Sequence, residues 1–233
     1  MRTILVLSAN PKNTNKLRLD EEIRDIQAAL EKARNRDQFV IVTRPALRVD
    51  GLIHELLSVK PQIVHFSGHG VGEEGLVLEN QSGQAQPVST EALAGLFKLF
   101  ENQIECVVLN ACYSKIQAEA IHQHINCVIG MNSAIGDRAA ISFANGFYTA
   151  LSSGRSYSDA YQFGCTAVQL QGIPESLTPV LLSRMVSQAV PTSEGAETKG
   201  TSKKPLEESS TTIIGGDYSK QIGSIRSAEN INM

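Results

Sequence analysis

The chain has 233 residues, of which 42% are hydrophobic and 19% charged, and its formal net charge is -3. This length and composition suit one globular domain with a tail rather than two full domains. The charge balance lacks the basic excess of a nucleic-acid-binding protein. No apolar run reaches the roughly 18 residues needed to cross a bilayer, so we expect no association with membranes.

The N-terminus and the cysteines bear on the compartment. The apolar stretch at residues 4–7 is too short for the core of a secretory signal. The four cysteines, at positions 106, 112, 127 and 165, form no CxxC pair and have no regular spacing. Free thiols in a reducing compartment are therefore expected, and we predict a cytoplasmic protein.

Short β-branched runs alternate with amphipathic stretches along the first 185 or so residues. Hydrophobic periodicity and cap residues predict the following elements in chain order: a strand at 3–8, a helix at 19–35, a strand at 38–43, a short helix after an Asp50 N-cap, a strand at 62–67, a hairpin at 75–88, a helix from a Ser89 N-cap to about 100, strands at 105–110 and 127–131, and helices at 137–152 and 156–170.

Strands separated by helices imply an α/β fold, with a mainly parallel sheet covered by helices on both faces. In such sheets ligands bind in the crevice outside the carboxyl ends of the strands. Candidate site residues are therefore expected at 8–10, 67–70 and 110–114.

The composition changes near residue 187. Residues 187–210 are rich in Ser, Thr, Glu, Gly and Lys and contain few large apolar side chains, so we predict a disordered linker after a domain at 1–186. Residues 211–233 regain isoleucines around a Gly-Gly-Asp-Tyr sequence. This segment is interpreted as a short interaction segment that pairs with a recruiting or activating partner, or as a frayed end with no role.

Two consecutive predicted strands end in residues suited to nucleophilic chemistry. The strand at 62–67 leads to His69, and the strand at 105–110 leads to Cys112. If the two strands are neighbours, about 4.8 Å apart, both side chains reach one substrate. An imidazole and the start of the helix after Cys112 would both favour the thiolate, which is the reactive form of cysteine. Gly70 has no side chain to block the backbone donors that a developing oxyanion needs.

The sequences VHFSGHG (64–70) and VVLNACYS (107–114) resemble the His and Cys boxes of the CHAT family, in the caspase–separase clan of cysteine peptidases. The resemblance extends to residues 8–11, 17–23 and 128–161 and covers roughly residues 3–183. It implies a caspase-like three-layer sandwich. It also implies that His69 is the general base, that Cys112 is the nucleophile, and that Gly70 and the Cys112 amide form the oxyanion hole.

The resemblance leaves the preferred substrate side chain open. Metacaspases have an acidic residue two positions before the cysteine, where this chain has Asn110, and no arginine of the caspase type stands in either box. Asp137 resembles the acidic residue that separases use to bind arginine, but aspartate is also a preferred N-cap, and we favour the interpretation that it caps its helix. Asn110 and Asp137 are kept as candidate substrate-binding residues.

Other sites have weaker support. His65 is interpreted as a hydrogen-bonded core histidine. His122, His124 and Cys127 lack a fourth zinc ligand, and the loop at 10–15 lacks the glycines of a flavin phosphate site, so neither metal nor cofactor is predicted.

The sequence therefore predicts a cysteine endopeptidase that cleaves protein substrates with a Cys112–His69 dyad. The family resemblance implies a bacterial effector in defence or regulated cell death. The alternative is a catalytically silent adaptor that signals through residues 211–233.

Overall fold

The computed structural model describes residues 1–184 and 211–214, which build a seven-stranded sheet in the order β10-β9-β8-β7-β3-β1-β2. Pairing is parallel from β2 across to β8 and antiparallel at β9 and β10. The strands are β1 (Arg2–Ser8), β2 (Phe39–Arg44), β3 (Ile63–Ser67), β7 (Cys106–Asn110), β8 (Cys127–Met131), β9 (Pro179–Arg184) and β10 (Thr211–Ile214).

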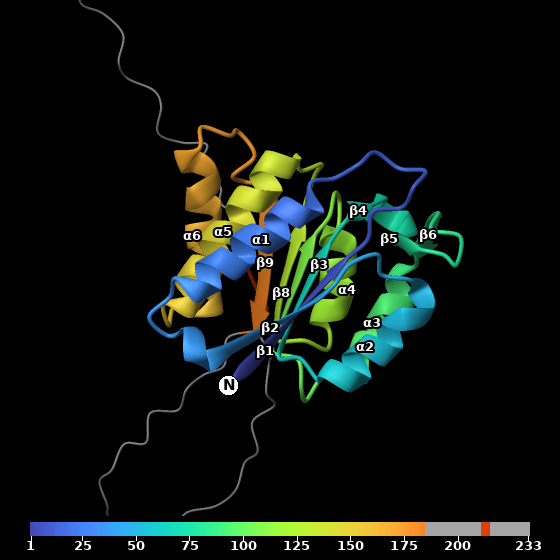
Figure 1. Cartoon of the computed structure of the whole chain (residues 1–233), viewed down its shortest axis with the longest axis horizontal. Helices are drawn as coiled ribbons and strands as arrows, with labels where there is room; N and C mark the ends of the chain where they lie inside the picture. Colours follow the sequence, from blue (N-terminus) through green and yellow to red (C-terminus); the bar gives the residue numbers. More distant parts are fainter. Residues whose placement is uncertain (185–210, 215–233) are drawn as a thin grey trace, which may run out of the picture.

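Helices cover both faces of this sheet (Figure 1). One face carries α1 (Leu19–Glu31), α5 (Asp137–Ser152) and α6 (Tyr157–Leu170), and the other carries α2 (Leu52–Val59), α3 (Thr90–Lys98) and α4 (Lys115–His122). The predicted three-layer α/β sandwich with a mainly parallel sheet is confirmed. Within residues 1–184 and 211–214, no helix is long and apolar enough to cross a membrane.

Alternation along the central strands divides the core into two layers. On β3, Ile63 packs in the layer under α1, α5 and α6, whereas Val64 and Phe66 pack in the layer under α2, α3 and α4. Each such fully buried side chain stabilises the fold by roughly 1.5–3 kcal/mol relative to an exposed one. By the same alternation His65 faces the α1 side, which determines what surrounds it.

A second, three-stranded sheet extends from the carboxyl end of β3. It consists of β4 (His69–Gly70), β5 (Leu76–Glu79) and β6 (Ala85–Val88), paired antiparallel in that order. The hairpin formed by β5 and β6 was predicted, and β4 was not. Because β4 contains His69, this small sheet fixes the backbone of the candidate base.

Two predicted caps have different outcomes. Ser89 is the N-cap of α3, and its hydroxyl accepts a hydrogen bond of 3.3 Å from the amide of Ala92, as predicted. The Asp50 cap is wrong, because Asp50 lies inside a 3-10 turn (Val49–Gly51) and Gly51 precedes α2 without a side-chain cap. An extra helical turn before α2 therefore takes the place of the cap.

Strand β9 (Pro179–Arg184) was not predicted. Its first residue is Pro179, which cannot donate to a ladder, and a proline at the start of an apolar run weakens a strand prediction. In the structure β9 pairs with β8 and, through Leu181 and Leu182, with β10.

The C-terminal predictions are only partly covered by the described residues. The predicted linker at 187–210 and residues 215–233 lie outside them. Residues 211–214 form β10 at the edge of the main sheet, antiparallel to β9.

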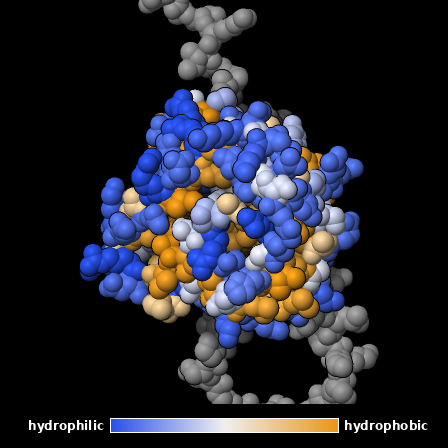
Figure 2. All heavy atoms as spheres, turned by 45° about the vertical axis from the view of Figure 1, so that its right-hand side comes forward, coloured by the Kyte–Doolittle hydropathy of each residue, from blue (hydrophilic) through white to orange (hydrophobic). Residues whose placement is uncertain are grey.

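The distribution of side chains on the surface is the one expected when the hydrophobic core lies inside the sandwich. On the face shown in Figure 2, hydrophilic side chains dominate and hydrophobic ones gather in smaller patches between them. Among the exposed large hydrophobic residues, Ile53 and Leu57 belong to α2, and Val71 and Tyr113 lie near the candidate site.

Candidate active site

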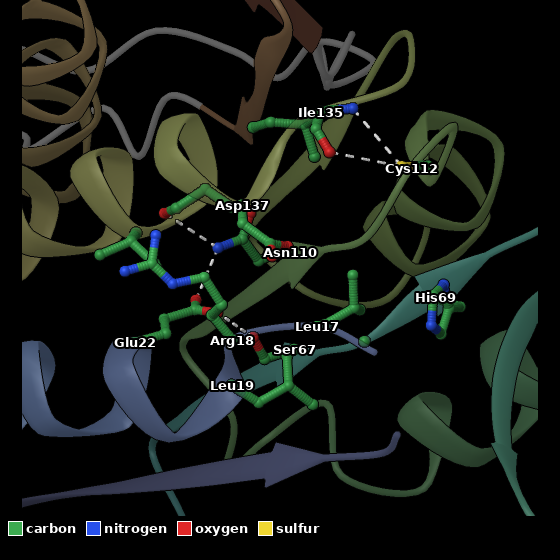
Figure 3. Close-up of a pocket in the computed structure, with 13 residues that line it drawn as sticks. Leu17, Arg18, Leu19, Glu22, Ser67, His69, Asn110, Cys112, Ile135 and Asp137 are labelled. Carbon is green, nitrogen blue, oxygen red and sulfur yellow. Dashed lines mark hydrogen bonds between the residues drawn. The ribbon is translucent and has the colours of Figure 1, made fainter. Parts of the chain in front are cut away.

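The strands that carry the two candidate catalytic residues are neighbours. β3 and β7 pair in parallel, with Ser67 opposite Asn110 at their carboxyl ends. His69 and Cys112 each follow by two residues, and both line one pocket beyond the sheet (Figure 3). The adjacency on which the sequence argument depended is therefore found.

The turn after β7 holds Cys112 in a fixed backbone position. The buried Ser114 hydroxyl donates to the carbonyl of Leu109 (2.9 Å) and accepts from the amide of Met131 (3.0 Å). Tyr113 adopts a left-handed φ of 55°, which is uncommon for a side chain with a Cβ, and its amide donates to Ser133 (3.1 Å). Such a backbone persists only when neighbouring contacts hold it, and here β7 and the loop after β8 supply them.

The Cys112 thiol is half-buried and faces the loop after β8. Its Sγ accepts a hydrogen bond from the amide of Ile135 at 3.4 Å and lies 3.6 Å from the carbonyl oxygen of the same residue. Figure 3 shows these two contacts, with His69 lying apart from them. In residues 1–184 no hydrogen bond joins the thiol to His69.

The imidazole of His69 is oriented by a backbone carbonyl. Nε2 of His69 lies 2.8 Å from the carbonyl oxygen of Asn15, in the loop between β1 and α1. Because a carbonyl can only accept, Nε2 carries the proton in this contact. In the neutral ring Nδ1 is then the unprotonated nitrogen, and it is the one available as a base.

Gly70 and Cys112 are packed backbone against backbone. A Cβ atom on Gly70 would lie 2.1 Å from the carbonyl oxygen of Cys112, closer than any side chain tolerates. The amide of Cys112 donates to no acceptor within the described part of the chain. Gly70 thus packs against the carbonyl of Cys112, and the oxyanion hole formed by Gly70 and the Cys112 amide stays a prediction.

A buried polar network lies beneath the pocket. The carboxylate of Glu22, on α1, accepts hydrogen bonds from Nε2 of His65 (2.9 Å), from the hydroxyl of Ser67 and from Nδ2 of Asn110 (2.6 Å). Nδ1 of His65 is hydrogen-bonded to the hydroxyl of Tyr148 on α5 (3.1 Å). The prediction that His65 is a hydrogen-bonded core histidine is confirmed, because its side chain is fully buried.

The pKa of the Glu22 carboxyl lies below its ordinary value despite its burial. Loss of solvent by itself would raise the pKa of this carboxyl, but the hydrogen bond and charge of His65, together with the hydrogen bonds from Ser67 and Asn110, outweigh that effect. The net result is a pKa below the ordinary value of 4.5. These contacts favour the charged form of Glu22, which lies buried against the imidazole of His65 beneath the pocket.

Asn110 has one side-chain orientation and one unpaired atom. Nδ2 donates both to Glu22 and to the carbonyl of Ala140 (3.1 Å), so two acceptors fix the amide group on that side. Oδ1 is then left buried without a protein donor. Asn110 lines the pocket, and its role in substrate binding stays a prediction.

Asp137 also lines the pocket and is half-buried. The alternative that it caps its helix is wrong in detail: Gly136 is the N-cap of α5, and Asp137 is the first helical residue. A carboxylate in this first turn is still favoured by the helix dipole. Its position is therefore compatible with substrate binding and with stabilising the first turn of α5, but not with capping the helix.

The residues of this pocket lie within a segment that matches a known protein family. A family model described as the CHAT domain matches residues 2–163. The chain belongs to the CHAT domain family.

Two curated proteins are similar in sequence to this chain. A Roc-COR-CHAT protease from an unknown prokaryotic organism is 26% identical over 180 residues, which cover 74% of this chain and 17% of that protein. A probable protease from Gillisia limnaea is 28% identical over 156 residues, covering 66% of this chain and 28% of that protein. The chain thus spans less than a third of the length of either relative.

Two solved structures share the fold of this CHAT domain. The Arg-specific cysteine proteinase gingipain R has a TM-score of 0.52 at 14% identity and covers 75% of this chain and 43% of its own. A secreted C11 cysteine protease from Bacteroides thetaiotaomicron has a TM-score of 0.51 at 10% identity and covers 78% and 66%. At these identities the likeness concerns the fold alone.

Sequence reasoning missed the roles of Glu22 and of the Asn15 carbonyl, and it placed Ser67 in the expected strand-end segment 67–70 without its contact to Glu22. Glu22 could have been found, because it lies four residues before Ile26 on the apolar face of α1, where a carboxylate needs a buried partner. The Asn15 contact could not, since a backbone carbonyl has no sequence signature.

Proposed function

We propose that this CHAT domain is a cysteine endopeptidase that cleaves protein substrates with Cys112 as nucleophile and His69 as general base. The observation that supports this most is the convergence of both side chains on one pocket at the ends of adjacent parallel strands. The Asn15 contact supports it further, because it leaves Nδ1 of His69 free to take a proton.

In the proposed reaction the thiol proton of Cys112 passes to Nδ1 of His69, and Sγ attacks the carbonyl carbon of the scissile peptide bond. The amides of Gly70 and Cys112 stabilise the oxyanion. The C–N bond then breaks as His69 returns the proton to the leaving amine. Water hydrolyses the thioester, again with His69 as base, and the thiol is restored.

The test combines cleavage with location of the covalent intermediate. The purified chain is incubated with a fluorogenic peptide library and, separately, with a peptidyl acyloxymethyl ketone, and the adduct is located by mass spectrometry. We expect cleavage and an adduct at Cys112, and loss of both in Cys112→Ala and His69→Ala. Retained cleavage in Cys112→Ala would refute the proposal.

The biological setting is part of the proposal. The family resemblance supports an effector in bacterial defence or regulated cell death, acting in the cytoplasm. Expression of the wild type, but not of Cys112→Ala, should reduce the viability of a bacterial host once the effector is activated. Equal toxicity of the two would favour the alternative, a catalytically silent adaptor.

The role of residues 211–233 remains a prediction. Their removal should abolish binding to a recruiting or activating partner and leave cleavage of a small peptide intact. Pairing of β10 with β9 in this chain bears on the test, because residues 211–214 must leave that edge before they can pair with another protein. Loss of peptide cleavage in the truncated chain would argue instead for a structural role of β10.

A further inference from the structure

We propose that Cys106 and Cys127 close into a reversible disulfide inside the folded sheet when the chain meets a peroxide. The two residues begin β7 and β8, at the end of the sheet opposite the pocket that contains Cys112. They take no part in the proposed cleavage of peptides. The redox site is therefore independent of whether the chain is a peptidase.

The backbone already holds the two cysteines at the separation that a disulfide needs. Strands β7 and β8 pair in parallel, and Cys106 and Cys127 are direct partners in the register. Neighbouring strands lie about 4.8 Å apart, and the Cα atoms of a disulfide lie about 4.4–6.8 Å apart. No shift of either strand is therefore needed before the bond can form.

The two thiols are also in contact. Both side chains belong to the layer under α1, α5 and α6, and their Sγ atoms lie 3.4 Å apart in a hydrogen bond. Both cysteines are free. A disulfide bond is about 2.05 Å long, so small rotations of the two side chains close the remaining gap.

A single buried cysteine is commonly a small core residue, and the pairing distinguishes these two from that case. The next partners along the same register are branched apolar residues, Val107 with Val128 and Val108 with Ile129. Only the first register position of β7 and β8 carries two side chains that can be oxidised to a covalent bond. The pair is thus a dithiol and not two separate core residues.

Access to the pair requires only a local opening. Cys106 and Cys127 are 0% and 3% exposed, so an oxidant does not reach them in the closed sheet. The path is short, because the residue before Cys106 is Glu105, whose side chain is 43% exposed, and the residue before Cys127 is the exposed Asn126. Hydrogen peroxide is little larger than water and fits such an opening. Oxidation should be slower here than at the half-buried Cys112.

The reaction consumes one peroxide in two steps. Burial raises the pKa of the Cys106 thiol well above its ordinary value, so the first step is assigned to Cys127. Its sulfur attacks one oxygen of hydrogen peroxide, the O–O bond breaks, and the thiol proton leaves with the other oxygen as water. The sulfur of Cys106 then attacks the sulfenic sulfur, and the hydroxyl leaves with the second thiol proton as water. A dithiol reductant reverses the oxidation.

The main experiment locates the bond by peptide mapping. The full chain and its Cys112→Ala variant are treated with hydrogen peroxide under native conditions, alkylated with N-ethylmaleimide in denaturant, and digested with trypsin without reduction. Cleavage after Lys115 separates the two cysteines, and Cys112→Ala removes the third cysteine from the peptide at 99–115. We expect that peptide to be linked to 116–138, with a mass lower by two hydrogen atoms than the sum of the reduced peptides, and to be released by dithiothreitol.

Two results would overturn the proposal. One is full alkylation of Cys106 and Cys127 in Cys112→Ala at a peroxide dose that has oxidised Cys112 in the parallel wild-type sample. The other is a bond from either residue to Cys165 in place of the predicted pair. Cys127→Ala should give no linked peptides and leave Cys106 fully alkylated, whereas Cys165→Ala should give the same linked pair as the wild type.

Thermal melting tests whether the bond forms inside the native sheet. The cross-link joins residues 21 positions apart and restricts the unfolded chain. In Cys112→Ala, oxidation should raise the melting temperature by about 5 °C or more, and dithiothreitol should reverse the rise. Cys127→Ala, treated in the same way, should show no rise. A melting temperature that falls as the linked peptides accumulate would contradict the proposal, because the bond would then have formed outside the folded sheet.

Discussion

Gly70 and Cys112 approach so closely that a Cβ atom on the glycine would lie 2.1 Å from the carbonyl oxygen of the cysteine. The contact joins β4, in the small sheet, to the turn after β7, in the main sheet. It holds the residue after His69 against the proposed nucleophile. The relative position of base and nucleophile thus depends on a backbone contact that only glycine permits.

Gly70→Ala should therefore lose activity. The methyl group must push the two backbones apart, and we expect kcat to fall about 100-fold or more, the scale on which loss of an oxyanion donor acts. The measurement is steady-state hydrolysis of the best peptide. Gly95→Ala in α3 is the matched control, since a Cβ there meets nothing within 4 Å and alanine favours a helix. Full activity in Gly70→Ala would contradict the packing argument.

Alkylation with iodoacetamide near pH 7.5 should modify Cys112 before the other three cysteines. Cys106 and Cys127 are buried, and burial also raises the pKa of the Cys106 thiol well above its ordinary value. Cys165 is half-buried, but loss of solvent raises the pKa of its thiol from 9.0 to about 11. Its thiolate fraction is therefore about 100-fold lower than that of a thiol with the ordinary pKa of 9.0. Peptide mapping over time gives the order. Faster labelling of Cys165 than of Cys112 would contradict this prediction, and Cys112→Ala should lack the fast phase.

Glu22 should make stability depend on acid pH. Its pKa is lowered in the folded chain, so its contribution is fully present above the unfolded value of about 4.5 and is lost as the pH falls through the folded value. Urea unfolding from pH 3 to 7 should show the wild type more stable than Glu22→Gln near neutrality, with the difference shrinking below about pH 4.5. A difference that stays constant over this range would mean that Glu22 does not titrate as described.

Ser114→Ala should weaken both the fold and the nucleophile turn. The substitution leaves the buried carbonyl of Leu109 and the amide of Met131 without their partner, at an expected cost of about 1–3 kcal/mol in the free energy of unfolding. Because this turn positions Cys112, kcat should fall more than KM rises. Ser58→Ala, at an exposed hydroxyl on α2, is the control and should change neither. Wild-type stability in Ser114→Ala would exclude the proposed role.

Much of the fold could be predicted from the sequence. The strands that became β1, β3, β7 and β8 are short apolar runs bounded by turn signals, and local hydrophobic patterning is sufficient to find such elements. His69 and Cys112 were identified because each follows one of these strands directly. Predictions failed where the signal is nonlocal or weak, as for β4, which is two residues long, and for β9, which begins with a proline.

The sequence by itself determined the layered architecture, the strand ends that carry chemistry and the residues of the two CHAT boxes, because periodicity and side-chain type are local properties. Tertiary structure alone decided that β3 and β7 are neighbours, that Asn15 orients His69, and that His65, Ser67 and Asn110 converge on Glu22. These contacts join residues 43 to 88 positions apart in the Glu22 network and 54 apart between Asn15 and His69. No local pattern encodes them, since they depend on the order in which the strands assemble and on the face that α1 buries.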